Sequence, residues 1–299
     1  MSARKRFREL IAAPGMVYAP GAYDALSARI IEAQGFDVVV AGGYAAAGAL
    51  LGQPDTGQSN MRDYADHYGR ICAAVNVPVY VDGDTGFGGV NNVRQMVRAF
   101  EDAGVAGLFI SDQVFPPRCG YMEGKQLISA EDMLAKLKAA LDARRDPDLF
   151  IVARTDALSV EGLDGAIARA QLYMDMGVDM AKVIGADQLD VFKRVLREVP
   201  GQQMANMSNA NPRGMPTPDE FAAAGAAMMT FPSAALFAAV GAVTRAMASL
   251  KSDHNLDAAR PGFCTLDGYY DLVGLKQQQQ SEQDYLSAAR KVMEGRGDK

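Results

Sequence analysis

The sequence predicts an α/β fold, a closed (β/α)8 or TIM barrel with extra helices at its C-terminal end. Three observations support this prediction. The chain has 299 residues, the size of one such barrel with an appendage. Short apolar runs alternate with longer amphipathic stretches almost to the C-terminus, and they form eight strand–helix units. No glycine-rich phosphate loop follows the first apolar run, as it usually would in a doubly wound open sheet.

The eight strands are expected where apolar runs are almost uninterrupted, because parallel strands in a barrel are buried on both faces. These runs are residues 16–19, 37–41, 77–81, 106–110, 149–153, 179–183, 203–206 and 226–231. Eight parallel strands of this kind are the number that closes a TIM barrel.

Helices are expected between the strands, where apolar residues recur with helical spacing. In residues 91–103, for example, Val93, Met96, Val97 and Phe100 form one apolar stripe. The remaining helices are expected at residues 23–34, 61–74, 130–143, 164–176, 188–198, 217–224 and 233–249.

The strand–helix rhythm stops near residue 252. Pro261 and Gly262 interrupt the chain, and a polar stretch with four glutamines leads into a last helix at residues 281–294. We therefore expect a barrel domain over residues 1–251 and a helical extension over residues 252–299. Terminal helices outside a barrel often cover a neighbouring subunit, so the extension indicates a homo-oligomer.

The composition excludes several function classes. The formal net charge is −6 and no basic tract offsets it, which argues against nucleic-acid binding and against an anionic membrane surface. Three isolated cysteines and two isolated histidines argue against a disulfide framework and a zinc site. The N-terminus lacks the apolar segment of a signal peptide, and no run approaches the roughly 18 apolar residues of a membrane span. We expect a cytoplasmic protein.

The first candidate site residues are two carboxylates at one strand end. Asp82 and Asp84 follow the third strand and precede a series of glycines. Active sites of TIM barrels form at the C-terminal ends of the strands, and carboxylates at this spacing can share a hard cation such as Mg²⁺. The alternative is that one of them caps the next helix.

Two further strand ends carry groups suited to an anionic substrate. After the fourth strand comes a long loop rich in proline, glycine and charge, in which Arg118 lies next to Cys119. A neighbouring cation lowers the pKa of a thiol and makes it reactive, although a lone cysteine is usually inert. After the fifth strand, the planar fork of Arg154 can bind a carboxylate, or instead pair with Asp156.

Backbone donors and a polar strand end complete the set. The segment Ala41-Gly42-Gly43-Tyr44 offers N–H groups to a carboxylate or an oxyanion. Asn206 lies at a polar strand end, and its residue type alone indicates no specific catalytic role.

Together these motifs resemble the isocitrate lyase/phosphoenolpyruvate mutase superfamily, and within it the methylisocitrate lyase branch. The likeness extends from Pro20 to about Ala248. It is carried by Gly52-Gln-Pro-Asp, Asp82-Gly-Asp-Thr-Gly-Phe-Gly, Arg118-Cys-Gly and Ala153-Arg-Thr-Asp-Ala. The resemblance implies a Mg²⁺-dependent barrel (Mn²⁺ could replace Mg²⁺) that exchanges a terminal helix between subunits and forms dimers of dimers.

The resemblance also implies a function. It indicates a carbon–carbon lyase that cleaves a small 2-hydroxy di- or tricarboxylate, of the 2-methylisocitrate or dimethylmalate kind, to an oxo acid such as pyruvate. Asp82 and Asp84 would hold the metal, and Cys119 would protonate the enolate product. The remaining residues implied in catalysis or substrate binding are Arg118, Tyr121, Arg154, Asp55, Ala41, Gly42, Gly43, Tyr44 and Asn206.

Several positions depart from the superfamily pattern. The loop has Pro117 in place of a lysine and Tyr121 in place of a histidine, and Ser111 stands where a glutamate usually begins the fourth-strand motif. Asp112 is adjacent but should point to the other face of the strand. Tyr121, Tyr44 and Lys182 could supply replacement groups.

Two other functions stay open at this point. One is an oxaloacetate decarboxylase or a carbon–phosphorus hydrolase or mutase. The other is a barrel that binds an oxo acid without turning it over.

Overall fold

The computed structural model describes residues 1–118, 120, 122–207 and 215–297. It comprises two compact units, Met1–Ala239 and Val240–Lys299, each taken by itself below. The division into a barrel domain over residues 1–251 and a helical extension over residues 252–299 stays a prediction.

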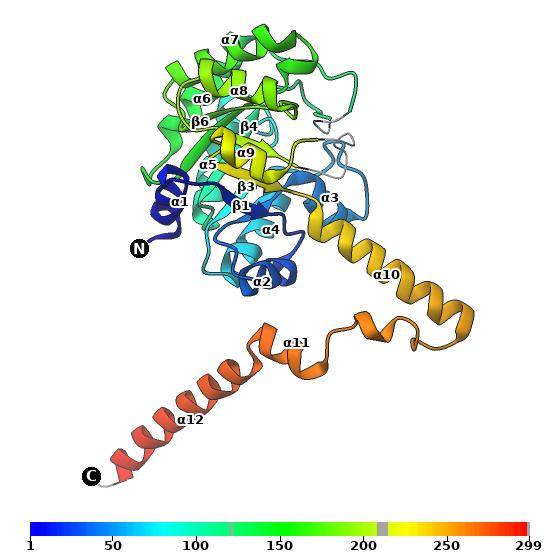
Figure 1. Cartoon of the computed structure of the whole chain (residues 1–299). Coiled ribbons are helices and arrows are strands. Elements are labelled where there is room, and N and C mark those ends of the chain that lie inside the picture. Colours follow the sequence, from blue (N-terminus) through cyan, green and yellow to red (C-terminus); the bar gives the residue numbers. More distant parts are fainter. Residues whose placement is uncertain (119, 121, 208–214, 298–299) are drawn as a thin grey trace. The chain divides into compact units, whose positions relative to one another are not determined.

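The first unit contains eight parallel strands in the described part of the chain (Figure 1). Strands β2 to β6 pair in chain order, and a second ladder has the order β1-β8-β7. A parallel bridge between Gly21 and Val40 joins the end of β1 to β2. Every expected strand overlaps one of these: β1 (Val17–Pro20), β2 (Val39–Ala41), β3 (Val79–Asp82), β4 (Gly107–Ser111), β5 (Phe150–Thr155), β6 (Met180–Val183), β7 (Met204–Asn206) and β8 (Met228–Phe231).

Helices follow the strands, as expected, and their starts are set by capping side chains. Asn60 and Asp63 form a capping box at the start of α4, and Thr217 and Glu220 do the same for α9. The predicted helices correspond to α2 (Ala25–Ala33), α4 (Met61–Ala74), α5 (Val90–Asp102), α6 (Ala130–Ala143), α7 (Gly162–Asp175), α8 (Leu189–Glu198), α9 (Pro218–Ala224) and α10 (Ala234–Asp253).

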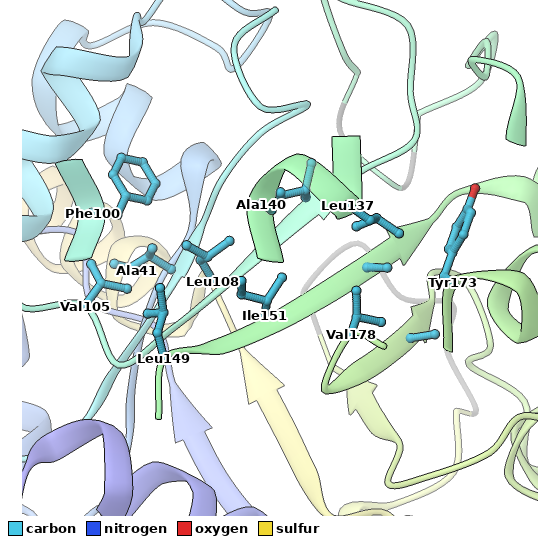
Figure 2. Packing of buried hydrophobic residues seen from close by; sticks show 14 of the residues in the cluster. Ala41, Phe100, Val105, Leu108, Leu137, Ala140, Leu149, Ile151, Tyr173 and Val178 are labelled. Atoms are coloured by element: carbon cyan, nitrogen blue, oxygen red, sulfur yellow. The ribbon is translucent and has the colours of Figure 1, made fainter. Parts of the chain in front are cut away.

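Alternate residues of strands β2 to β8 enter two different apolar clusters. One set, which includes Leu108 and Ile151, packs against the helices (Figure 2). The other set, which includes Tyr80, Phe109 and Val152, fills the interior of the barrel. This division follows from the two-residue period of a strand, and it decides which side chains reach the mouth of the barrel.

Two helices of the first unit were not predicted. Helix α1 (Ala3–Ala12) begins at Ser2, whose side chain accepts from the amide of Lys5. Its Phe7 enters the interior cluster, where its ring lies 5.8 Å from the ring of Tyr80. Helix α3 (Gly43–Leu51) occupies a segment that we interpreted only as a source of backbone N–H groups.

The second unit contains most of α10, from Val240 onward, the short helix η2 (Arg260–Gly262), α11 (Leu266–Val273) and α12 (Leu275–Gly297). The last predicted helix lies inside α12, whereas α11 was not predicted. In α10, four large apolar side chains are exposed at helical spacing: Val240, Val243, Met247 and Leu250.

Helix α10 is long and apolar enough, by length and composition alone, to cross a membrane, with a mean hydropathy of 1.3. No uninterrupted apolar run of membrane-spanning length marks this helix in the sequence, because it is rich in alanine and Arg245 lies in its middle. A single helix of this length and composition is weak evidence for a membrane span.

Candidate active site

The mouth of the barrel holds a cavity of about 430 Å³. It is lined by side chains from the C-terminal ends of most strands, where TIM barrels place their active sites. Nine of the site residues expected from the sequence line it: Gly42, Gly43, Tyr44, Asp55, Asp82, Asp84, Arg118, Arg154 and Asn206.

The other three expected residues are placed differently. Ala41 does not line the cavity; its side chain belongs to the cluster between strands and helices, to which alternate residues of β2 point. Cys119 and Tyr121 lie outside the described residues.

Asp82, the last residue of β3, is held by backbone amides on both carboxylate oxygens. Oδ1 accepts from the amide of Asp84 at 2.7 Å, and Oδ2 accepts from the amide of Gly43 at 3.0 Å. Gly43 is the first residue of α3, so the positive end of a helix faces this carboxylate. The sequence interpretation offered the Gly43 amide to a substrate; in the structure it orients Asp82.

Asp84 lies in the tight turn after β3, with a positive φ of 52°. Its carboxylate accepts from the amide of Thr85, and its carbonyl accepts from the amide of Ser111 at 2.8 Å. Lys136 of α6 fixes the same turn by donating to the Thr85 carbonyl at 2.9 Å. Helix α5 is capped by Gly89, so the alternative that an aspartate of this pair caps the next helix is wrong.

Asp55 brings a third carboxylate to the same region. A Cβ on Gly43 would lie 3.0 Å from Asp82 Oδ2, 3.1 Å from the Tyr64 hydroxyl and 3.4 Å from Asp55 Oδ2. Burial, reinforced by repulsion from Asp82, raises the pKa of Asp55 to about 7 and that of Asp84 to about 6. Acidic groups gathered without enough counter-charge are suited to a cation.

The donor set fits Mg²⁺ in chemistry and in number. Mg²⁺ prefers carboxylate oxygens and usually keeps several waters or substrate oxygens in its shell. Among the described residues, no three His, Cys, Asp or Glu side chains are close enough to enclose a metal by themselves. An ion on Asp82 and Asp84 would therefore complete its shell with water and substrate.

Arg154, at the end of β5, lines the cavity. It also forms the ion pair with Asp156 that the sequence offered as an alternative role. Its Nε donates to Asp156 Oδ2 at 2.8 Å, and Nη2 donates to Oδ1 at 3.1 Å. Asp156 is fully buried. Lys125 and Ser111 also donate to it, at 3.2 and 3.3 Å.

Asp112 points away from the cavity, as the alternation of the strand predicted. It is fully buried, and its Oδ1 accepts from the backbone amide of Asp156 at 3.0 Å. Its Oδ2 accepts from the Tyr173 hydroxyl at 2.9 Å. Asp112 thus supports the turn that carries Asp156 and, through it, Arg154.

Tyr64 and Tyr80 line the cavity and were missed by sequence reasoning. Tyr80 lies in an apolar run and looked like a core residue. The signal that could have identified it is its position two residues before Asp82, which places both on the inner face of β3.

Relatives with curated names support the family assignment. The family model described as phosphoenolpyruvate phosphomutase matches residues 7–251. The chain is 36% identical to 2,3-dimethylmalate lyase of Eubacterium barkeri, over 96% of this chain and 99% of that protein. It is 36% identical to 2-methylisocitrate lyase of Aeropyrum pernix, over 96% and 92%. It is 37% identical to a chloroplastic carboxyvinyl-carboxyphosphonate phosphorylmutase of Arabidopsis thaliana, over 90% and 81%.

Solved structures agree with this result. Oxaloacetate acetylhydrolase bound to 3,3-difluorooxalacetate matches with a TM-score of 0.90 and 27% identity, over 95% of this chain and 97% of that one. A 2,3-dimethylmalate lyase matches with a TM-score of 0.88 and 29% identity, over 95% and 96%. Phosphonopyruvate hydrolase bound to oxalate and Mg²⁺ matches with a TM-score of 0.85 and 26% identity, over 96% and 100%. The predicted barrel and superfamily are confirmed: the chain belongs to the phosphoenolpyruvate phosphomutase family, within the isocitrate lyase/phosphoenolpyruvate mutase superfamily.

Proposed function

We propose that this protein is a Mg²⁺-dependent carbon–carbon lyase that cleaves a small 2-hydroxy di- or tricarboxylate, of the 2-methylisocitrate or dimethylmalate kind, to an oxo acid such as pyruvate. The observation that carries this proposal is the placement of Asp55, Asp82 and Asp84 in one cavity with Arg154. The lyase names of relatives that match nearly the whole chain favour cleavage over the decarboxylase, hydrolase and mutase alternatives.

The residues divide into a metal side and an anion side. Asp82 and Asp84 hold Mg²⁺ (or Mn²⁺), which when bound stabilises the negative charge that develops on substrate oxygens. Arg154 orients a substrate carboxylate with its planar, charged guanidinium, and Asp156 fixes the direction of that group. Asn206 and the segment Gly42–Tyr44 contribute further polar surface of the cavity.

The proton transfer is assigned to the loop after β4. A base takes the proton of the 2-hydroxyl as the Cα–Cβ bond breaks and the oxo acid is released, and Cys119 gives a proton to the carbanion-like enolate that remains. Arg118 and Tyr121 of the same loop are proposed to assist. In the described part of this loop, Gln113 accepts from the amide of Arg118 and donates to its carbonyl, each at 2.9 Å. The Arg118 guanidinium in turn donates to the carbonyl of Glu123 at 2.9 Å.

The proposal is tested with a panel of 2-hydroxy di- and tricarboxylates in the presence of Mg²⁺, with detection of the released oxo acid. We expect turnover of at least one acid, lost on chelation of the metal. Asp84→Ala and Cys119→Ser should abolish turnover, while Cys264→Ser, an exposed thiol in the second unit, is the matched control. Wild-type turnover in the first two variants would refute the roles assigned to them.

The alternatives predict other results on the same panel. Release of CO₂ from oxaloacetate, or of phosphate from a phosphonate, would identify a decarboxylase or a hydrolase. Tight binding of oxalate without turnover of any acid would identify a binding protein.

The helical extension, together with the end of α10 that leads into it, is proposed to pack on a second copy of the chain, in a helix-exchanged dimer of dimers. The support is the exposed apolar stripe of α10 and further exposed apolar side chains on α12, among them Leu286, Val292 and Met293. Such patches on soluble proteins mark contact surfaces. The composition and the catalytic proposal together favour a cytoplasmic protein that binds no nucleic acid.

A further inference from the structure

Two polar groups at the inner end of the cavity have no partner among the described residues. Lys182 lies on β6, lines the cavity and is only 5% exposed, yet its ammonium makes no hydrogen bond or ion pair to any described residue. Tyr80, on β3, also lines the cavity, and its hydroxyl is buried without a hydrogen-bond partner in the described chain.

Both groups lie against one aromatic ring. The ring of Tyr80 is 5.9 Å from that of Phe109, and the Lys182 ammonium is 5.9 Å from the centre of the same Phe109 ring. Phe109 is on β4, between the two strands that carry these groups, and it lines the cavity too. The Tyr80 side chain and the Lys182 ammonium therefore lie on the same aromatic ring in the barrel interior.

Of the two cations against Phe109, only one is paired with an acid in the described chain. Arg154 also lies over Phe109, at 5.5 Å, but its guanidinium is bound to the buried carboxylate of Asp156. Lys182, its register neighbour on β6, has no such acid within ion-pair distance in the described chain. A buried ammonium without a hydrogen-bond acceptor is costly, and an anionic oxygen that enters the cavity would satisfy both it and the hydroxyl.

We propose that Lys182 and Tyr80 bind the second carboxylate of the substrate and so determine specificity for it. This inference rests on the proposed function for the role of the first carboxylate, which Arg154 and the metal would bind. Lys182 supplies a charged donor and Tyr80 a neutral one, and both lie against the apolar ring of Phe109.

The test compares two acids that differ only in that carboxylate: malate, and lactate, which lacks it. Dissociation constants are measured by calorimetry on the Mg²⁺-loaded protein. Wild type should bind malate more tightly than lactate. Because a hydrogen bond to a charged group contributes about 1.5–3 kcal/mol, Lys182→Met should weaken malate binding by roughly 10–100-fold. It should change lactate binding by less than about threefold.

Tyr80→Phe keeps the ring and removes only the hydroxyl, so it should weaken malate binding by roughly 3–10-fold. Lys138→Met removes the same charge from an exposed helix position and is the matched control. If Lys182→Met does not fold, Lys182→Gln must give the same pattern.

Equal losses for malate and lactate in the Lys182 variants, or no loss for either, would overturn the proposal, as would equal affinities in the wild type. The measurement is independent of turnover. A failure of the lyase assay with the predicted binding pattern would refute the proposed reaction and leave the carboxylate site standing.

Discussion

The guanidinium of Arg154 is held in a fork-to-fork contact by Asp156, only two residues further along the chain. Asp156 is in turn fixed from three sides, by Lys125, by Ser111 and, through its backbone amide, by Asp112. A flexible arginine is thereby presented to the cavity in one orientation. Such orientation before binding reduces the entropy that substrate binding costs.

Asp156→Asn should therefore impair catalysis and stability together. The variant leaves Arg154 and Lys125 without their shared anion in a buried position, and breaking a buried pair costs about 3–5 kcal/mol. We expect kcat/KM to fall by roughly 10–100-fold, a size typical of lost supporting contacts, and the urea midpoint to fall as well. Asp142→Asn, which breaks an exposed pair with Lys138, should change neither. An unchanged kcat/KM in Asp156→Asn would show that the orientation of Arg154 does not matter.

Asp84→Asn should act in opposite directions on metal binding and on stability. Burial and the neighbouring Asp82 raise the pKa of Asp84 to about 6, so at pH 8 its charge destabilises the metal-free protein. Removing it should raise the melting temperature of the metal-free protein and weaken Mg²⁺ binding by at least ~10-fold. Calorimetry with Mg²⁺ and thermal unfolding in EDTA measure the two effects. A lower melting temperature in EDTA would contradict the argument.

Lys182→Met should stabilise the ligand-free protein by an amount that depends on pH. Burial, with a smaller contribution from Arg154, lowers the pKa of Lys182 from 10.5 to about 7. The unfolded chain binds this proton more tightly than the folded one, so wild-type stability gains from this group as the pH rises from about 7 towards 10.5. The advantage of the variant should be ~1–4 kcal/mol at pH 6–7 and should shrink above that. Urea unfolding of both proteins at several pH values tests this, and a difference that is constant with pH would refute it.

Acidic substitutions in the apolar stripe of α10 should dissociate the assembly. Val243→Glu or Met247→Glu places a charge where the second copy is proposed to pack, and an unpaired buried charge is not tolerated at an interface. Ala248→Glu, exposed but away from the stripe, is the control. Light scattering should report a smaller species for the first two variants only. The same mass for all three would locate the interface elsewhere.

The strands were predictable because a buried parallel strand requires an almost continuous apolar run, whatever its partners are. Helix α1 was missed because its surface is strongly basic and only Phe7 and Ile11 are buried. Helix α3 was missed because two glycines and a series of alanines carry little periodic signal. Short segments next to strands that lack a clear apolar periodicity are where local sequence says least about structure.

The candidate site could be predicted as a set of strand ends but not as a set of contacts. The sequence placed Asp82, Asp84 and Arg154 at the mouth of the barrel, because each follows a strand. It did not show that the Gly43 amide donates to Asp82, or that Tyr80 lines the cavity with a hydroxyl that has no partner among the described residues. Those facts depend on how strands far apart in the sequence meet, which no local pattern encodes.

Because Phe7 of α1 stacks on Tyr80, which lines the cavity, the first helix supports part of the cavity wall. The Phe7 ring also meets Phe150 edge-on, at 5.3 Å. It therefore contacts inward-facing aromatic rings of both β3 and β5. Deletion of residues 1–12 would therefore remove more than a surface helix. It would also remove the Phe7 ring against which the Tyr80 ring is packed. Protein engineering that shortens this end of the chain should be expected to alter ligand selectivity even where the barrel still folds.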